Sequence, residues 1–291
     1  MVWLGGVLLA GVAGLLVLAR IVGALWTRET AARLSDISYG AMAPRPEPRT
    51  ETADLEELPD PVQRFFRVSL SRDHPSILEA HIRQRGVFRA EPGRPWSPMV
   101  AEQYFRTAPP GFVWDARIRM SGVLQVRVRD SYGRSGGEMK GKVFGLFPVV
   151  DATGEAALSQ AALQRYLAEA AWLPTALLPG SGVEWSPLSD RSARATIRDG
   201  DVVASLDFLF SEAGQIEAVR ANRYREEDGR YELRPWEGRF WNHADNHGLR
   251  IPMDAEVSWL LGQERFVYWR GSLTDVTYRY GSLSAASAIL H

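Results

Sequence analysis

The chain has no cysteine among its 291 residues. This absence excludes disulfide bonds, thiolate metal ligands, a cysteine nucleophile and a lipid-modified N-terminal cysteine. It leaves the compartment open, because a protein without cysteine fits an oxidising or a reducing environment. Lysine is also scarce, with only Lys140 and Lys142, so arginine carries almost all of the positive charge.

The chain also lacks a large net charge. Its 34 basic and 35 acidic residues leave a formal net charge of −1, which gives no reason to expect nucleic acid as a partner. Apolar residues make up 45% of the sequence, enough for one sizeable folded domain. The composition does not identify a protein partner, and the protein partner stays unknown.

One long apolar run lies at the N-terminus. Residues 2–19 carry no charged side chain, and after Arg20 the run resumes as far as Trp26. Eighteen helical residues span about 27 Å, close to the hydrocarbon thickness of a bilayer. The sequence therefore predicts a single-pass transmembrane anchor over residues 1–27, which contacts the membrane through residues 2–26.

A cleaved signal peptide is the alternative to a retained anchor, because Val22 and Ala24 satisfy a small-residue cleavage pattern. Two features favour retention: no lysine or arginine precedes the run, and Arg20 would lie just upstream of the cut. Arg20, Arg28 and Arg33 all follow the main apolar run, so the positive-inside rule favours a cytoplasmic domain.

The remaining chain divides into three parts. Residues 28–58 form a juxtamembrane segment and a tether, in which closely spaced prolines prevent regular structure. Residues 59–281 form one soluble β-rich domain, which opens with a short helix capped by Asp60. Residues 282–291 form a small, polar tail.

Within the domain, apolar and polar residues alternate with a period of two, which predicts antiparallel strands. The alternation is clear in residues 112–119 and 124–129. A helical stripe interrupts it over residues 158–172. We therefore expect a mainly β (α+β) fold, an antiparallel, strongly curved sheet or unclosed half-barrel of about eleven strands, with residues 158–178 as a covering helical segment.

Two motifs point to chemistry that their context does not support. Residues 133–137 match the Gly-x-Ser-x-Gly string of serine hydrolases, but a strand pattern follows where that nucleophile needs a helix. His243 and His247 have the spacing of metal ligands, but turn-forming residues lie between and after them. We interpret both as loops and assign no catalytic residue, no metal site and no cofactor.

Arginines gather on the polar faces of strands that we expect to be neighbours. From residue 77 to residue 134 there are ten arginines against five acids. The simple interpretation is a solvated sheet face, and the alternative is a basic surface that contacts lipid phosphates or an acidic partner. The arginines of this set are Arg83, Arg85, Arg117, Arg119, Arg127 and Arg129.

Tryptophan is abundant, with ten residues, eight of which follow the predicted anchor. Tryptophans suit a solid core and the lining of an apolar cavity equally, so composition leaves both open. If there is a cavity, we expect aromatic side chains to line the concave face, and charged neighbours to meet a polar head group. The predicted ligand-binding residues are Trp114, Arg117, Tyr166, Glu169, Trp172, Trp236, Glu237, Trp269 and Arg270.

Five strings of the sequence form a recognisable set. They are Leu58–Arg67, Pro110–Met120, Arg165–Leu178, Pro235–Phe240 and Tyr268–Gly271. Together they resemble an uncharacterised bacterial family of membrane-anchored β-rich proteins, a domain of unknown function, and this resemblance implies no activity. In its order of elements the chain is also similar to LolA-type lipoprotein and lipid carriers, which implies helices that cover a concave apolar sheet.

Three functions remain open from the sequence. The first is a non-catalytic, membrane-tethered protein that binds a lipid or another hydrophobic molecule. The alternative is a membrane-proximal protein-interaction module with a solid core and a basic docking face, and the third is an uncharacterised enzyme. The resemblance to LolA-type carriers implies a periplasmic or extracytoplasmic domain. The arginines that follow the apolar run favour a cytoplasmic domain instead, so the sequence does not decide on which side of the cell membrane the domain lies.

Overall fold

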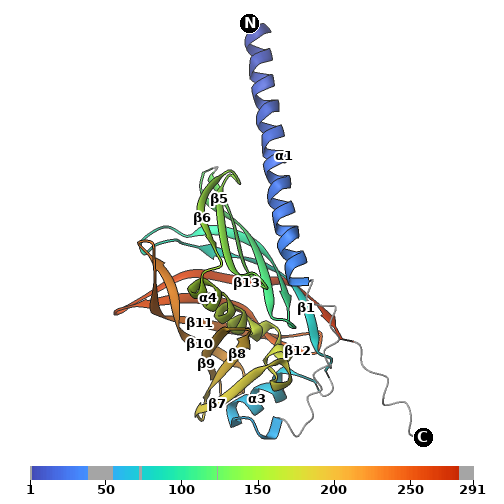
Figure 1. Ribbon diagram of the computed structural model, residues 1–291, viewed down its shortest axis with the longest axis vertical. Coiled ribbons are helices and arrows are strands. Elements are labelled where there is room, and N and C mark those ends of the chain that lie inside the picture. The colour runs from blue at the N-terminus through green and yellow to red at the C-terminus, as the bar shows by residue number, and fades with distance from the viewer. Residues whose placement is uncertain (1, 39–54, 72–73, 123, 282–291) are drawn as a thin grey trace, which may run out of the picture.

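The computed structural model describes residues 2–38, 55–71, 74–122 and 124–281 of the chain. Most of the predicted proline-rich tether and the whole of the predicted tail lie outside these described residues. Figure 1 shows a long N-terminal helix beside a curved sheet, with short helices on the sheet.

Thirteen strands form one antiparallel sheet. Their bounds are β1 Ile77–Phe88, β2 Ser97–Arg106, β3 Gly111–Ser121, β4 Leu124–Gly133, β5 Gly136–Val143, β6 Phe147–Thr153, β7 Val183–Ser189, β8 Ser192–Asp199, β9 Val202–Phe210, β10 Ile216–Glu227, β11 Arg230–Asn246, β12 Leu249–Leu261 and β13 Glu264–Tyr280. The spatial order is β6-β5-β4-β3-β2-β1-β13-β12-β11-β10-β9-β8-β7, which is two meanders joined by the pairing of β1 with β13. The predicted count of about eleven was therefore two too low.

The sheet is curved but not closed, because its edge strands β6 and β7 do not pair with each other. The chain between these edges crosses the concave side, which we call the inner face, as helix α4 (Ala156–Glu169) and three 3₁₀ turns that end at Ser181. Leu163 and Leu167 of α4 are fully buried there. The predicted covering segment is thus confirmed, with the α-helix shifted by two to three residues.

Strand β3 shows how the sequence alternation divides the two faces. Phe112, Trp114 and Ala116 point to the inner face and are buried in the core. Asp115 and Arg117 alternate with them and therefore point to the opposite side, which we call the outer face.

Helix α3 (Asp60–Ser69) packs at the far end of the sheet from the N-terminus (Figure 1). Phe65 and Phe66 are buried, and the ring of Phe65 lies 5.8 Å from that of Phe210. Pro59 occupies the N-cap position and Asp60 lies in the first turn. The prediction of Asp60 as the cap was therefore wrong by one residue.

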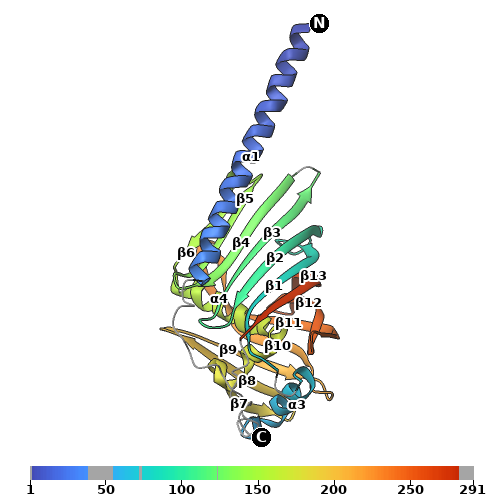
Figure 2. The ribbon, with the colours of Figure 1, turned by 90° about the vertical axis from the view of Figure 1, so that its right-hand side faces the viewer.

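Helix α1 (Val2–Ser38) is longer than the predicted anchor, because residues 28–38 of the expected juxtamembrane segment continue it. Its C-terminal half packs on the outer face of β2, β3 and β4 (Figure 2), and its side chains reach Glu138 and Lys142 of β5. Trp26 is 1% exposed, and Ile37 is also buried. Within the part of the chain that the structure describes, no helix has the length and hydropathy needed to cross a bilayer.

The two rejected motifs are both found in hairpins. Gly133 pairs with Gly136 at the tip of the β4–β5 hairpin, so this glycine-rich string is a turn as predicted. His243 lies within β11, which runs to Asn246, and only His247 belongs to the following turn, so the expected loop was too long. Within the described ranges, no three histidine or acidic side chains gather closely enough to hold a metal.

Candidate functional site

A chain of hydrogen bonds crosses the inner face beneath the end of α4. The Trp114 indole N–H donates to Gln84 Oε1 over 2.9 Å, and Gln84 Nε2 donates to Gln103 Oε1 over 3.0 Å. Gln103 Nε2 then donates to Glu169 Oε2 over 2.6 Å. Two of the predicted site residues, Trp114 and Glu169, are therefore linked through two glutamines that the sequence did not single out.

Arg165 closes this network from α4. Its Nε donates to Glu169 Oε1 over 2.9 Å, the i,i+4 pair that the sequence spacing favours, and its Nη1 donates to Asp130 Oδ2 over 2.6 Å. Its guanidinium lies 4.8 Å from the ring centroid of Trp114. Burial lowers the pKa of Arg165, but the two carboxylates outweigh it and raise the pKa overall. Burial raises the pKa of Glu169 despite this partner.

The other predicted aromatic residues of the inner face are core residues. Tyr166 is 1% exposed and packs against Phe105. Trp172 is 2% exposed, and its ring meets that of Phe240 edge to face at 6.4 Å. Trp269 is half-buried and packs against the same core. Together with α4, these side chains form the buried core on the concave side of the sheet.

Three predicted site residues lie on the outer face instead. Glu237 and Arg270 directly follow Trp236 and Trp269 in their strands, and adjacent strand residues point to opposite faces. Arg117 lies opposite Arg127 on the outer face of β3 and β4. The structure therefore does not bring these three charged residues together with the inner tryptophans.

Glu237 and Glu256 form the centre of an outer-face charge cluster. Glu237 accepts hydrogen bonds from Arg220 over 2.8 Å and Arg239 over 2.6 Å, whereas Glu256 accepts them from Arg270 and Arg265. Burial raises the pKa of each carboxyl, but the arginine hydrogen bonds outweigh burial and hold both pKa values below the usual range.

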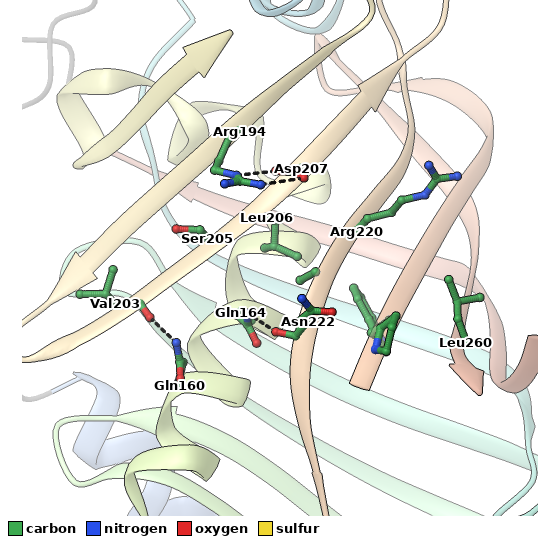
Figure 3. Close-up of a pocket in the computed structure, with 13 residues that line it drawn as sticks. Gln160, Gln164, Arg194, Val203, Ser205, Leu206, Asp207, Arg220, Asn222 and Leu260 are labelled. Carbon is green, nitrogen blue, oxygen red and sulfur yellow. Dashed lines mark hydrogen bonds and ion pairs between the residues drawn. The ribbon is translucent and has the colours of Figure 1, made fainter. Parts of the chain in front are cut away.

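A gap opens in the sheet between β9 and β10. The two strands pair only as far as Asp207 and Arg220, and beyond this point they separate. Two side chains of α4 bridge the open edges: Gln160 Nε2 donates to the carbonyl of Val203 over 3.2 Å, and Gln164 Nε2 donates to that of Asn222 over 3.1 Å (Figure 3). Helix α4 thus supplies hydrogen-bond donors to two backbone carbonyls at the edges of the gap.

This gap forms a cleft of about 470 Å³, which we call the interstrand cleft. Trp236, Leu206 and Leu260 supply apolar side chains to its lining, and Gln160 and Gln164 supply amides (Figure 3). The charged side chains of the lining are Arg194, Asp207 and Arg220. Gln164 is only 5% exposed, and its Oε1 has no hydrogen-bond partner within the described part of the chain. The cleft therefore combines an apolar surface with a buried acceptor.

Arg223 fixes the position of Trp236 beside the cleft. Its guanidinium lies 4.6 Å from the indole centroid and donates to the carbonyl of Ala161 over 2.8 Å. The Trp236 N–H donates to the Tyr268 hydroxyl over 3.0 Å. Burial lowers the pKa of Arg223, and the neighbouring Arg165 lowers it further. Trp236 is thus the one predicted ligand residue that lines the interstrand cleft.

The sequence matches a family model over residues 56–278, most of the folded domain. The chain belongs to the DUF6920 family. That family is described as one of unknown function, and the match confirms the resemblance expected from the sequence. No curated protein matches the chain.

Several solved structures have a backbone that follows a similar path to that of this chain, at low sequence identity. A DUF1329 family protein from Desulfovibrio piger has 11% identity and a TM-score of 0.40, with 79% of this chain and 93% of that chain covered. A LolA superfamily protein from Nitrosomonas europaea has 9% identity and a TM-score of 0.36, with 76% and 93% covered. A beta-barrel-like DUF1849 protein from Brucella abortus has 10% identity and a TM-score of 0.29, with 71% and 100% covered.

Proposed function

We propose that the domain is a non-catalytic binding protein for a hydrophobic molecule and that the interstrand cleft is its binding site. The observation that carries this proposal is the buried, unpartnered Oε1 of Gln164 beside the apolar surfaces of Trp236 and Leu260. An apolar ligand body would cover the indole and the leucine. A ligand hydroxyl or N–H would donate to Gln164 Oε1.

The size of the cleft limits the ligand. Because α4 and the 3₁₀ turns cover the concave side, the ligand is expected to enter from the outer side of the sheet. A volume of about 470 Å³ falls in the usual range of small-molecule pockets. It suits a compact apolar molecule or one part of a lipid, and a whole two-chain lipid would require α4 to move.

We further propose that the domain is tethered to a cell membrane through residues 2–26. The uncharged run of residues 2–19 supports this proposal. The arginines that follow the run support a cytoplasmic domain, and the likeness of the order of elements to LolA-type carriers supports an extracytoplasmic one. The proposal therefore includes the tether and leaves the side of the membrane open.

The binding proposal is tested by native mass spectrometry of the full chain, extracted in mild detergent. We expect a bound species of constant mass in the wild type and its loss in Leu260→Trp, which fills the cleft. Leu261→Trp is the matched control, because Leu261 is the adjacent residue and is not part of the cleft lining. Equal ligand occupancy in the two variants, or no bound species in the wild type, would rule out the cleft as the site.

The interaction module remains a second candidate function, favoured by the buried core on the concave side. A charged outer face suits a docking domain whose partner carries the complementary charge. For this function we expect that the wild type carries no small molecule and that crosslinking in native membranes captures one protein through the outer face. The module would be favoured if substitution of Arg83 and Arg85 abolishes that crosslink. The Leu260→Trp and Leu261→Trp variants should then form the crosslink as the wild type does.

A further inference from the structure

The β5–β6 hairpin carries an apolar cluster at the edge of the sheet. Edge strands usually carry charges that prevent association, and large exposed apolar patches mark interaction sites. Here the exposed fractions of the side chains range from 40% to 65%. The residues of this cluster, which we call the hairpin tip, are Phe144, Leu146, Phe147, Val149 and Val150.

The hairpin tip lies beside the point where α1 leaves the domain. Gly145 of the turn contacts Val22, such that a Cβ on this glycine would lie 2.7 Å from Val22 Cγ1. Twenty residues of α1, Val2–Ile21, extend beyond that level, or about 30 Å of helix. This length matches the hydrocarbon thickness of a bilayer. Both ribbon views show α1 continuing past the end of the hairpin (Figures 1 and 2).

The C-terminal half of α1 is fixed to the sheet by specific polar contacts. Asp115 Oδ2 accepts hydrogen bonds from the Trp26 indole N–H over 2.7 Å and from the Thr30 hydroxyl over 2.9 Å. One turn further along the helix, Arg33 forms an ion pair with Glu138. These contacts hold the hairpin tip at a defined height along the helix axis.

A basic row lies two residues below the tip, about 7 Å along β5. Arg117, Arg127 and Lys142 face one another directly across β3, β4 and β5. Glu29 of α1 pairs with Lys142 over 3.2 Å. Arg117 and Arg127 form no ion pair with any residue that the structure describes. We call these three residues the basic row.

We infer that the hairpin tip and the basic row are a second membrane contact, made with the bilayer that holds α1. The apolar tip enters the interfacial layer of an anionic membrane, and Arg117 and Arg127 bind lipid phosphates, which guanidinium groups match in geometry. The inference rests on the proposed tether. It adds that the domain lies against the bilayer by this edge of the sheet instead of hanging freely on a linker.

The absence of cysteine allows a direct test with single-cysteine variants of the full chain. Phe147→Cys, labelled with an environment-sensitive fluorophore and reconstituted into vesicles of phosphatidylcholine and phosphatidylglycerol, should show a blue shift and quenching by brominated lipid chains. Leu188→Cys is the matched control, because Leu188 is 48% exposed on β7, at the other edge of the sheet. Its label should show neither effect.

A third label, at Leu9→Cys, separates the inference from the tether. Quenching at position 9 without quenching at position 147 would overturn the hairpin contact and leave the tether intact, whereas absence of quenching at both would overturn the tether. A blue shift at position 147 without lipid quenching would mean that a protein covers the tip, which also overturns the inference.

The phosphate contact is tested by charge. Arg117→Gln should remove the part of the quenching at position 147 that depends on phosphatidylglycerol. Arg83→Gln, on the same outer face but opposite Glu102 and Asp275, should leave it unchanged. Quenching that is equal in neutral and anionic vesicles would overturn the assignment of the basic row to lipid phosphate.

Discussion

Arg165 is the side chain on which the polar part of the inner face depends. Arg165→Met keeps the aliphatic stem but leaves the carboxylates of Glu169 and Asp130 without the cation that binds both. We expect the free energy of unfolding to fall by about 3–5 kcal/mol, because breaking a buried ion pair leaves uncompensated charge. Urea unfolding of the detergent-solubilised full chain measures this change.

Arg194 provides the control for that experiment. It forms a two-bond pair with Asp207, with Nε–Oδ1 2.6 Å and Nη2–Oδ2 3.0 Å, but its side chain is 50% exposed. Arg194→Met should therefore cost at most about 1 kcal/mol, as exposed pairs do. If the two arginine variants cost the same, the inner network is solvated and contributes little.

Residue patterns in the sequence predicted part of the candidate site. Period-two alternation places Trp114 on the inner face and could also have separated Trp236 from Glu237, because adjacent strand residues cannot share a face. The roles of Gln160 and Gln164 were not predictable in this way. The gap that these two glutamines bridge begins where β9 and β10 stop pairing, and no local pattern in either strand marks that point.

At the scale of elements, the docking of α1 can be tested through Asp115. Asp115→Ala removes the acceptor of two hydrogen bonds from Trp26 and Thr30. Their loss should weaken docking by about 2 kcal/mol and speed amide hydrogen exchange in residues 26–38 about thirty-fold. Hydrogen exchange with mass spectrometry of the full chain measures this.

Asp207→Ala is the matched control for the docking test, since Asp207 is an outer-face carboxylate of β9 that contacts Arg194 and not α1. It should leave exchange in the helix unchanged. Unchanged protection of α1 in Asp115→Ala would show that apolar contacts of Trp26 and Ile37 are sufficient for docking.

The sequence predicted most elements but not the full extent of α1. Strands, the covering helix and the Gly133–Gly137 turn follow from local periodicity and turn chemistry. Residues 28–38 have no apolar stripe, because they contact the sheet mainly through Ile37 and ionic groups such as Arg33. A helix held by so few apolar contacts gives no periodic signal, so its last turns were assigned to the linker region.

At the scale of the whole molecule, the sheet order depends on one pairing between distant segments. β1 and β13 pair from Ile77–Tyr280 to Phe88–Trp269, and this joins the two meanders into one sheet. Neighbouring strands in each meander are joined by short turns that the sequence shows. The long-range pairing has no local signature. Opposite Arg83 and Gln84, Thr274 of β13 is an extra residue, and this β-bulge shifts the alternation of the faces along β13.

Stability against pH is a property of the whole molecule to which the outer charge cluster should contribute, together with Glu79 and Glu138, whose pKa values are also lowered by arginine partners. The pKa values of Glu237 and Glu256 are lowered in the folded state, because arginine hydrogen bonds outweigh the effect of burial. Their contribution is therefore present above the unfolded pKa of about 4.5 and is lost as the pH falls through the folded values. We expect the Tm of the full chain to fall steeply on acidification from about pH 5 to about pH 3.

The slope of Tm against pH distinguishes the outer charge cluster from Glu169, because loss of the cluster and loss of Glu169 should change this slope in opposite directions. The double variant Glu237→Gln with Glu256→Gln should have a lower Tm at neutral pH and a shallower decline in acid. Burial raises the pKa of Glu169, so its ionisation opposes stability as the pH rises, and Glu169→Gln should make the acid decline steeper. Glu217→Gln, on an exposed carboxyl, should leave the slope unchanged. Thermal unfolding followed by circular dichroism measures all four slopes, and an unaltered slope in the double variant would show that other carboxyls control the acid transition.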